Sequence, residues 1–164
     1  MSVSYPKETI RKLVERTLPW EDLKRIMSSF KDPDRFEKYI EVLQEKTGWK
    51  ERIILPLTEH LMIVSKDSRM IVKALCGYEF GDYRENWKLK ALIHVRNKVE
   101  QFKEIYPDPL YPDPNWCEIR EFICPGCGIL LDVDVVPPGY PVIKEFEPDI
   151  ETFYIKWLKK PIPK

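Results

Sequence analysis

The sequence lacks any apolar run long enough to cross a bilayer, and its longest runs, such as residues 61–64, are short. The first twenty residues mix charged and apolar side chains, so no secretory signal is recognisable. An excess of one charge is also missing, because 27 lysines and arginines balance 27 aspartates and glutamates. A neutral chain argues against nucleic-acid binding and gives no electrostatic reason to bind a membrane. We therefore expect a soluble cytoplasmic protein.

Catalytic and phosphate-binding motifs are missing as well. The six glycines form no G-x-G-x-x-G or Walker loop, and neither G-x-S-x-G nor H-E-x-x-H occurs. His60 and His94 lie in or beside predicted strands, where a lone imidazole is usually a hydrogen-bonded structural group. Asp132 and Asp134 share one face of a predicted strand, but 27 acidic residues produce such pairs by chance. The sequence predicts no catalytic and no cofactor-binding residue on this chain.

Proline and aromatic residues are abundant instead, with 15 prolines, 5 tryptophans and 8 tyrosines. Prolines fix the backbone and remove donors, so much of the chain is expected to form rigid, extended connections. Tryptophan and tyrosine close small cores and are also enriched at protein interfaces. A chain of 164 residues fits one domain, which we place over residues 1–164.

Residues 1–50 have the apolar periodicity of helices. The first predicted helix carries four apolar residues on one face: Ile10, Leu13, Val14 and Leu18. A second short helix covers residues 20–30. A third is predicted to begin with Asp32 as its cap and Pro33 at its first helical position, and to end near Gly48.

Residues 51–136 change to the short apolar runs of strands, separated by turn residues. The predicted strands cover residues 53–55, 61–64, 70–75, 89–95, 118–123 and 129–136. Residues 99–106 are predicted to form a short helix, and residues 137–164 a proline-rich arm with a final helix over about 149–158. The predicted fold class is α+β: an N-terminal helical unit, an antiparallel β meander with a zinc-ribbon-like hairpin, and a C-terminal helix.

The sharpest local pattern is Cys124-Pro125-Gly126-Cys127-Gly128, at the tip of a predicted hairpin. Two cysteines with this spacing, and glycines that permit the tight turn, direct both thiolates at one tetrahedral metal ion. A redox-active pair would instead stand at the start of a helix, whose dipole lowers the pKa of the first thiol. A strand pattern follows here, which favours zinc over thiol–disulfide chemistry.

A zinc ribbon needs a second half, and Cys76 supplies it at the end of the predicted strand 70–75. Cys117 is excluded because it lies seven positions before Cys124 along a predicted strand, about 23 Å of extended chain. A fourth ligand is not specified, with Asp82, His94 or water as the alternatives. The predicted metal ligands are Cys76, Cys124 and Cys127.

Several segments, in this order and spacing, match a known family over residues 10–163. They are Lys31-Asp32-Pro33-Asp34-Arg35-Phe36, Ile53-Ile54-Leu55-Pro56-Leu57, Glu85-Asn86-Trp87-Lys88-Leu89, His94-Val95-Arg96, Glu104-Ile105-Tyr106-Pro107, Ile119-Arg120-Glu121, Cys124-Pro125-Gly126-Cys127-Gly128, Tyr140-Pro141-Val142-Ile143 and Phe146-Glu147-Pro148-Asp149-Ile150-Glu151, followed by Phe153-Tyr154 and Trp157-Leu158. In these segments the chain resembles the gamma subunits of the ATP-dependent acetone and acetophenone carboxylases.

The resemblance implies a small structural subunit of a complex that carboxylates acetone, acetophenone or a related ketone with bicarbonate. It implies large hydantoinase-like alpha and beta subunits as partners, which hold ATP and a divalent metal. It also implies a zinc-ribbon-like element on this chain. The family's further cysteines near the first knuckle are absent, because this chain has Ala74 and Gly81 there.

Two other interpretations stay open at this point. A free-standing zinc-ribbon binding module would be a monomer that unfolds when its zinc is chelated. A small hydrolase or decarboxylase would use the three thiolates and an open zinc position. No general base is placed by any spacing in the sequence, which ranks the enzyme last.

Overall fold

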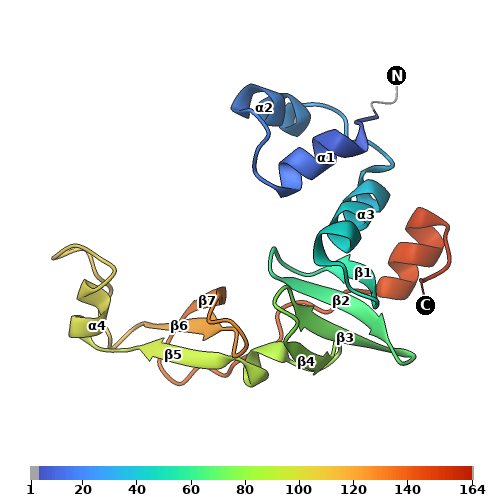
Figure 1. Ribbon diagram of the computed structural model, residues 1–164. Coiled ribbons are helices and arrows are strands. Elements are labelled where there is room, and N and C mark those ends of the chain that lie inside the picture. The colour runs from blue at the N-terminus through green and yellow to red at the C-terminus, as the bar shows by residue number, and fades with distance from the viewer. Residues whose placement is uncertain (1–3, 164) are drawn as a thin grey trace.

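The computed structural model describes residues 4–163, so the predicted ranges 1–50 and 137–164 begin or end just outside it. The molecule is bent, as Figure 1 shows. N-terminal helices stand on a four-stranded sheet, and a three-stranded sheet extends sideways from it, with a short helix at its tip. Both sheets are antiparallel meanders, and a helical element closes the chain. The α+β prediction is confirmed, with the strands divided between two sheets.

The N-terminal helices are α1 (Lys7–Val14), α2 (Trp20–Ser28) and α3 (Arg35–Thr47). Because α1 ends at Val14, the predicted place of Leu18 on its apolar face is wrong. The structure thus places three helices close to where the sequence predicts them, with a shorter first helix.

The start of α3 lies two residues later than predicted, and Pro33 is outside the helix. The buried carboxylate of Asp32 accepts the backbone N–H of Asp34 at 2.8 Å, which closes a turn ahead of the helix. At the other end, Gly48 adopts φ +63°, a left-handed conformation that ends helices and favours glycine.

The four-stranded sheet lies between α3 and the C-terminal helix. Its strands are β1 (Arg52–Pro56), β2 (Leu61–Lys66), β3 (Arg69–Ala74) and β4 (Glu79–Asp82), in that order. On one face, Ile53 and Val64 pack against Leu43 of α3. On the other, Ile54 packs against Tyr154. This alternation explains why β1 and β2 read as nearly continuous apolar runs: both faces are covered.

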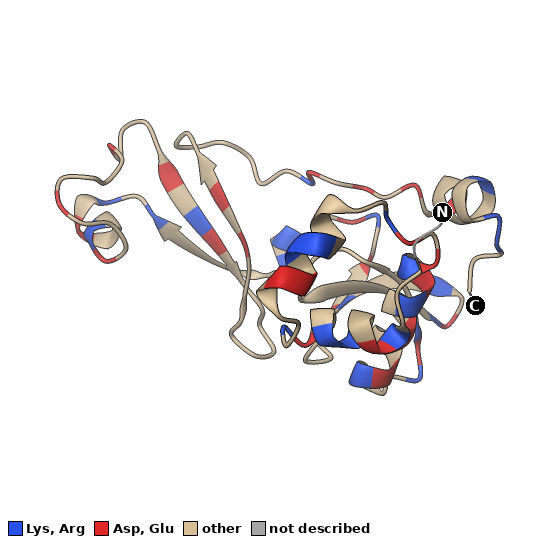
Figure 2. Ribbon diagram, turned by 90° about the horizontal axis from the view of Figure 1, so that it is seen from above, with Lys and Arg blue, Asp and Glu red and all other residues tan. Residues whose placement is uncertain are grey.

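The three-stranded sheet contains β5 (Leu92–Arg96), β6 (Glu118–Ile123) and β7 (Leu130–Val136). The short helix α4 (Val99–Lys103) follows β5 at the tip. Figure 2 shows this sheet as an arm that projects from the rest of the molecule. The predicted strand 89–95 is wrong in its first part, because a 3-10 helix, η1 (Trp87–Lys90), precedes β5.

The C-terminal element η2 (Thr152–Leu158) is wound as a π-helix, where the sequence predicted a final helix over 149–158. The hydroxyl of Tyr154 donates to the carbonyl oxygen of Ile54 at 2.7 Å, which fixes the element on the sheet. Lys159, at φ +55°, ends it. Among residues 4–163, no helix combines the length and the apolarity that crossing a membrane requires.

Candidate metal centre

Two hairpin turns, one from each sheet, bring three thiols together. Cys76 lies in the turn between β3 and β4, and Cys124 and Cys127 lie in the turn between β6 and β7. The sulfur atoms of all three lie within 4.8 Å of one another. In each turn a glycine with positive φ directly follows a cysteine, Gly77 at +96° and Gly128 at +73°. The turns are therefore two similar knuckles that face each other.

The sulfur spacing fits a shared tetrahedral ion. Two thiolates on one zinc, each about 2.3 Å from it at tetrahedral angles, stand about 3.8 Å apart. The sulfur atoms of Cys76 and Cys124 are 3.6 Å apart. A disulfide would hold them at about 2.0 Å, so the pair is not bonded. Three thiols in two opposed turns thus form a donor set that could hold a metal ion and that supplies three of the four ligands of a tetrahedral zinc.

Close packing of the two turns requires glycine at position 126. A Cβ atom added there would stand 2.9 Å from Cβ of Tyr78 and 3.1 Å from the sulfur of Cys76. Both distances are shorter than ordinary van der Waals contact, so a side chain would push the knuckles apart. The backbone of the second knuckle approaches the first because Gly126 leaves room for it.

The thiols differ in burial and in their ease of ionisation. Cys124 is fully buried, and burial raises the pKa of its thiol, although the backbone N–H groups of Gly126 and Cys127 oppose that shift. Cys127 is exposed, and a hydrogen bond from the backbone N–H of Ile129 lowers its pKa. The group therefore combines one buried thiol with two exposed ones.

The other candidates from the sequence lie elsewhere. Cys117 is not a member of the thiol group, and burial raises the pKa of its thiol. The proposals of Asp82 and His94 as the fourth ligand are not supported, since neither belongs to the group. The carboxylate of Asp82 instead receives two hydrogen bonds from Arg84, which with its backbone N–H hold the Asp82 pKa well below its usual range.

A second cluster, which sequence reasoning missed, surrounds Lys88. Its ammonium lies 2.7 Å from Asp134, 2.8 Å from Asp132 and 3.1 Å from Glu145. Lys88 is only 2% exposed, and although burial opposes ionisation, these carboxylates raise its pKa above the ordinary value. The three acids thus surround a lysine, and the Asp132–Asp134 pair that the sequence presented as incidental belongs to a buried ionic cluster. No local sequence signal marks Lys88 as buried. Lys90, two positions further on and in the same segment, is exposed.

Comparison with known proteins places this geometry in a family. The family model for the acetone carboxylase gamma subunit matches residues 47–158, which include all three thiols and the Lys88 cluster. The chain is also 44% identical, over 163 residues, to a protein from Xanthobacter autotrophicus named acetone carboxylase gamma subunit. That match covers 98% of this chain and 97% of the relative. The chain belongs to the acetone carboxylase gamma subunit family.

A second relative is named as a subunit of a different carboxylase. The acetophenone carboxylase beta subunit of Aromatoleum aromaticum is 33% identical over 87 residues, 52% of this chain and 67% of that protein. The gamma-subunit family model spans both sheets and η2 but leaves out α1, α2 and all of α3 except its last residue. The model therefore covers the part of the chain that builds the two knuckles and the ionic cluster.

Proposed function

We propose that this chain is a small, non-catalytic subunit of an ATP-dependent complex that carboxylates acetone, acetophenone or a related ketone with bicarbonate. The observation that carries the proposal is the 44% identity, along 98% of this chain, to the protein named acetone carboxylase gamma subunit. A resemblance along nearly the whole chain supports the same place in the same kind of assembly. Its partners would be large alpha and beta subunits of the hydantoinase-like type, which hold ATP and a divalent metal.

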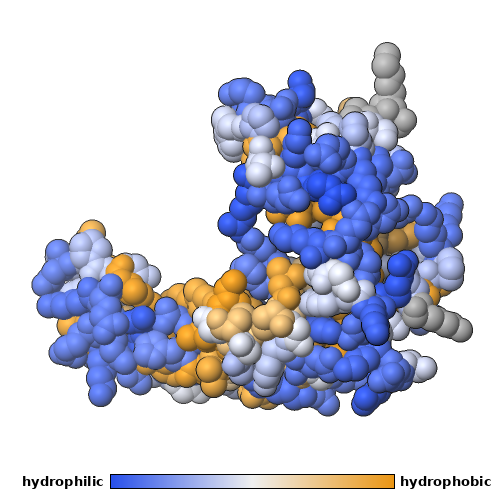
Figure 3. Space-filling view, in the orientation of Figure 1, coloured by the Kyte–Doolittle hydropathy of each residue, from blue (hydrophilic) through white to orange (hydrophobic). Residues whose placement is uncertain are grey.

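The surface of the three-stranded sheet supports a role inside an assembly. On one face of this sheet, Leu92, Leu130, Val133 and Val135 are exposed, the last of them to 63%. Figure 3 shows apolar atoms gathered over this arm. The same face also carries His94, Arg96 and Glu121. Exposed apolar side chains beside polar ones are typical of contact sites between proteins. A companion subunit that covers this face would remove it from water.

We propose further that Cys76, Cys124 and Cys127 hold a structural zinc ion. Bound there, zinc would supply a cross-link between the two knuckles and no reaction chemistry. Cys124 and Leu131 already share an apolar cluster with Leu61 and Val72 of the first sheet, so the thiols stand at the junction of the sheets. This shared cluster also supports a single domain over residues 1–164. We place this domain in the cytoplasm. The site would fix the angle at which the arm projects.

Reconstitution of the carboxylase tests the proposed function. Companion subunits, prepared with and without this chain, are assayed for ATP-dependent incorporation of labelled bicarbonate into acetone and into acetophenone. The proposal predicts a stable, active complex only when the chain is present, and no turnover by the chain alone. A complex that lacks the chain and is equally active and stable would refute it. Turnover by the isolated chain that disappears in Cys127→Ala would identify a metal-dependent enzyme instead.

A further inference from the structure

The helical end of the molecule carries an apolar cavity of about 540 Å³ that opens to the surface. Its apolar walls come from all three N-terminal helices and include Ile10, Leu13, Ile26, Phe36, Tyr39 and Leu43. A volume of this size lies in the range of real binding sites and accommodates several side chains. Figure 3 shows apolar atoms between the hydrophilic side chains of this end of the molecule. The thiol residues are not part of its lining, although Leu75, which is, directly precedes Cys76.

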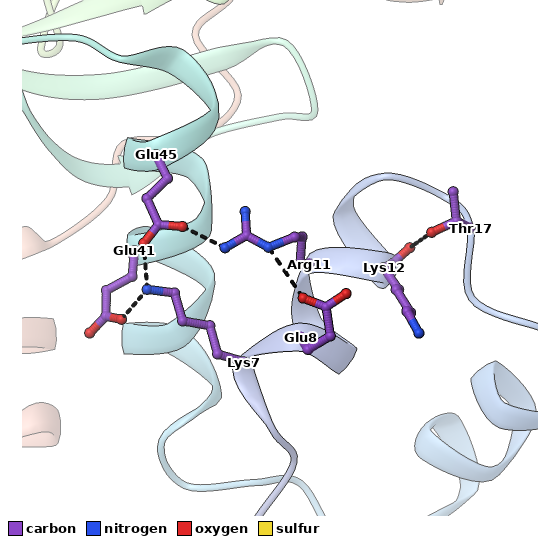
Figure 4. Close-up of polar contacts among 7 residues, drawn as sticks. All are labelled: Lys7, Glu8, Arg11, Lys12, Thr17, Glu41 and Glu45. Atoms are coloured by element: carbon purple, nitrogen blue, oxygen red, sulfur yellow. Dashed lines mark hydrogen bonds and ion pairs between the residues drawn. The ribbon is translucent and has the colours of Figure 1, made fainter.

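One wall of the cavity is fixed in place. Lys7 of α1 reaches Glu41 at 2.8 Å and Glu45 at 2.6 Å on α3, and Arg11 reaches Glu45 at 2.6 Å. Figure 4 shows these ion pairs between the two helices. Together they hold α1 beside α3 from the outside. The ion pairs therefore fix the position of α1 relative to α3, and with it the wall of the cavity that these two helices form.

The rim of the cavity is positively charged. Its two acids already have partners: Asp32 pairs with Lys38, and Glu59 pairs with Arg16. Arg35 and Lys46 lie at the rim and form no ion pair within residues 4–163. Lys31, also at the rim, donates only to backbone carbonyl oxygens at the end of α2. Lys31, Arg35 and Lys46 therefore have no carboxylate partner within residues 4–163.

The helix α2, which closes one side of the cavity, has no buried residue. Trp20 and Met27 on this helix are each 63% exposed, and Phe30 just after it is 86% exposed. None of these three side chains lines the cavity, but α2 contributes Ile26 to it. The helix is therefore held on the molecule with large apolar side chains left in water.

We propose that a segment of a companion subunit docks in this cavity, inserting apolar side chains between α1, α2 and α3 and presenting one carboxylate to Arg35 and another to Lys46, at the opposite end of α3. The inference rests on the proposed function for the existence of that subunit. Charge complementarity selects the occupant: an apolar segment flanked by Asp or Glu residues satisfies both the walls and the rim.

The test measures how tightly purified chain variants bind the companion subunits, at low and at high salt. Arg35→Glu with Lys46→Glu reverses two exposed rim charges that hold no partner in the fold. The variant Ile26→Trp fills the cavity from α2 and leaves the rim unchanged. Lys50→Glu with Lys98→Glu is the matched control, with the same charge change outside the cavity lining.

The proposal predicts at least tenfold weaker binding at low salt for the rim variant, a difference that shrinks at high salt because salt screens exposed charges. Ile26→Trp should weaken binding by a similar factor at both salt concentrations, and the control should bind like the unchanged chain. Rim and cavity variants that bind like the unchanged chain would overturn the docking site and leave the proposed function intact. Failure of the unchanged chain to bind would overturn both. Self-association of the chain that the rim variant abolishes would make a second copy the occupant and overturn the proposal.

Discussion

The sulfur atoms of Cys76 and Cys124 lie 3.6 Å apart, although 48 positions separate the two residues in the sequence. One belongs to a turn of the four-stranded sheet and the other to a turn of the three-stranded sheet. The contact between these two atoms therefore joins the two halves of the β structure. A shared metal ion would make this junction rigid, and several consequences can be measured.

The first measurable consequence is the zinc content of the protein. We expect one zinc per chain in the purified protein, and a large loss of bound zinc in Cys76→Ser and in Cys124→Ser, because each removes one of three thiolates. Cys117→Ser is the matched control, since this thiol is outside the group. Elemental analysis after extensive dialysis measures the ratio. Equal zinc in all four proteins, or none in the unchanged chain, would contradict the site.

Gly126→Ala tests the close approach of the knuckles. We expect a loss of about 1–3 kcal/mol in the free energy of unfolding, together with weaker zinc binding, because the new Cβ atom would overlap Tyr78 and crowd the sulfur of Cys76. Gly77→Ala is the comparison, since nothing lies within 4 Å of its Cβ position and only its positive φ opposes the change. Denaturant titration measures both variants. A Gly126→Ala protein no less stable than the unchanged chain would show that the turns have room to spare.

The fold could be predicted to a large extent because its elements are locally encoded. Ile53 and Ile54 are both buried, on opposite faces of β1, and they read as a buried strand. The prediction missed β4, which is only four residues long and includes Gly81. It also extended a strand into η1, where the Asn86 side chain accepts the Lys88 N–H and starts a 3-10 turn. Short elements fixed by tertiary contacts leave weak periodicity.

Lys88→Met tests the buried ionic cluster. The variant leaves the carboxylate of Asp134, which is only 8% exposed, without its cation, and a destabilisation of about 3–5 kcal/mol is expected. Lys90→Met removes a lysine that pairs with Glu85 at the surface, so its effect should stay below about 1 kcal/mol. Thermal and denaturant unfolding distinguish the two. Similar stabilities for both variants would mean that the cluster is solvated.

Stability at low pH depends on Asp32. Burial opposes its ionisation, but hydrogen bonds from Lys38, Tyr5 and Asp34 hold its pKa below the ordinary value of 3.8. Because the pKa of the folded state is the lower one, the carboxylate stabilises the fold above pH 3.8, and this contribution is lost as the pH falls through the folded value.

Asp32→Asn should therefore lower the free energy of unfolding by about 2 kcal/mol at pH 7, where it removes charge-assisted hydrogen bonds. The gap from the unchanged chain should narrow when both are unfolded in urea near pH 3. The exposed Asp34→Asn is the control and should show little change at either pH. A gap of equal size at both pH values would show that the charge of Asp32 contributes nothing.

Less of the candidate site than of the fold could be predicted from the sequence. The C-x-x-C spacing marks Cys124 and Cys127, and the end of a strand marks Cys76, so the three thiols could be named before they were seen together. The close approach of the two turns at Gly126 could not be predicted from the sequence, because it depends on how two distant turns meet. The Lys88 cluster gave no signal either, since a lysine in a charged segment normally lies in water.

Native mass spectrometry of the chain, isolated gently from its own cells, tests the central proposal most directly. The account predicts that it arrives with large companion subunits in a fixed ratio and carries one zinc per copy. A folded monomer that arrives without companions would contradict the subunit assignment, whatever its zinc content.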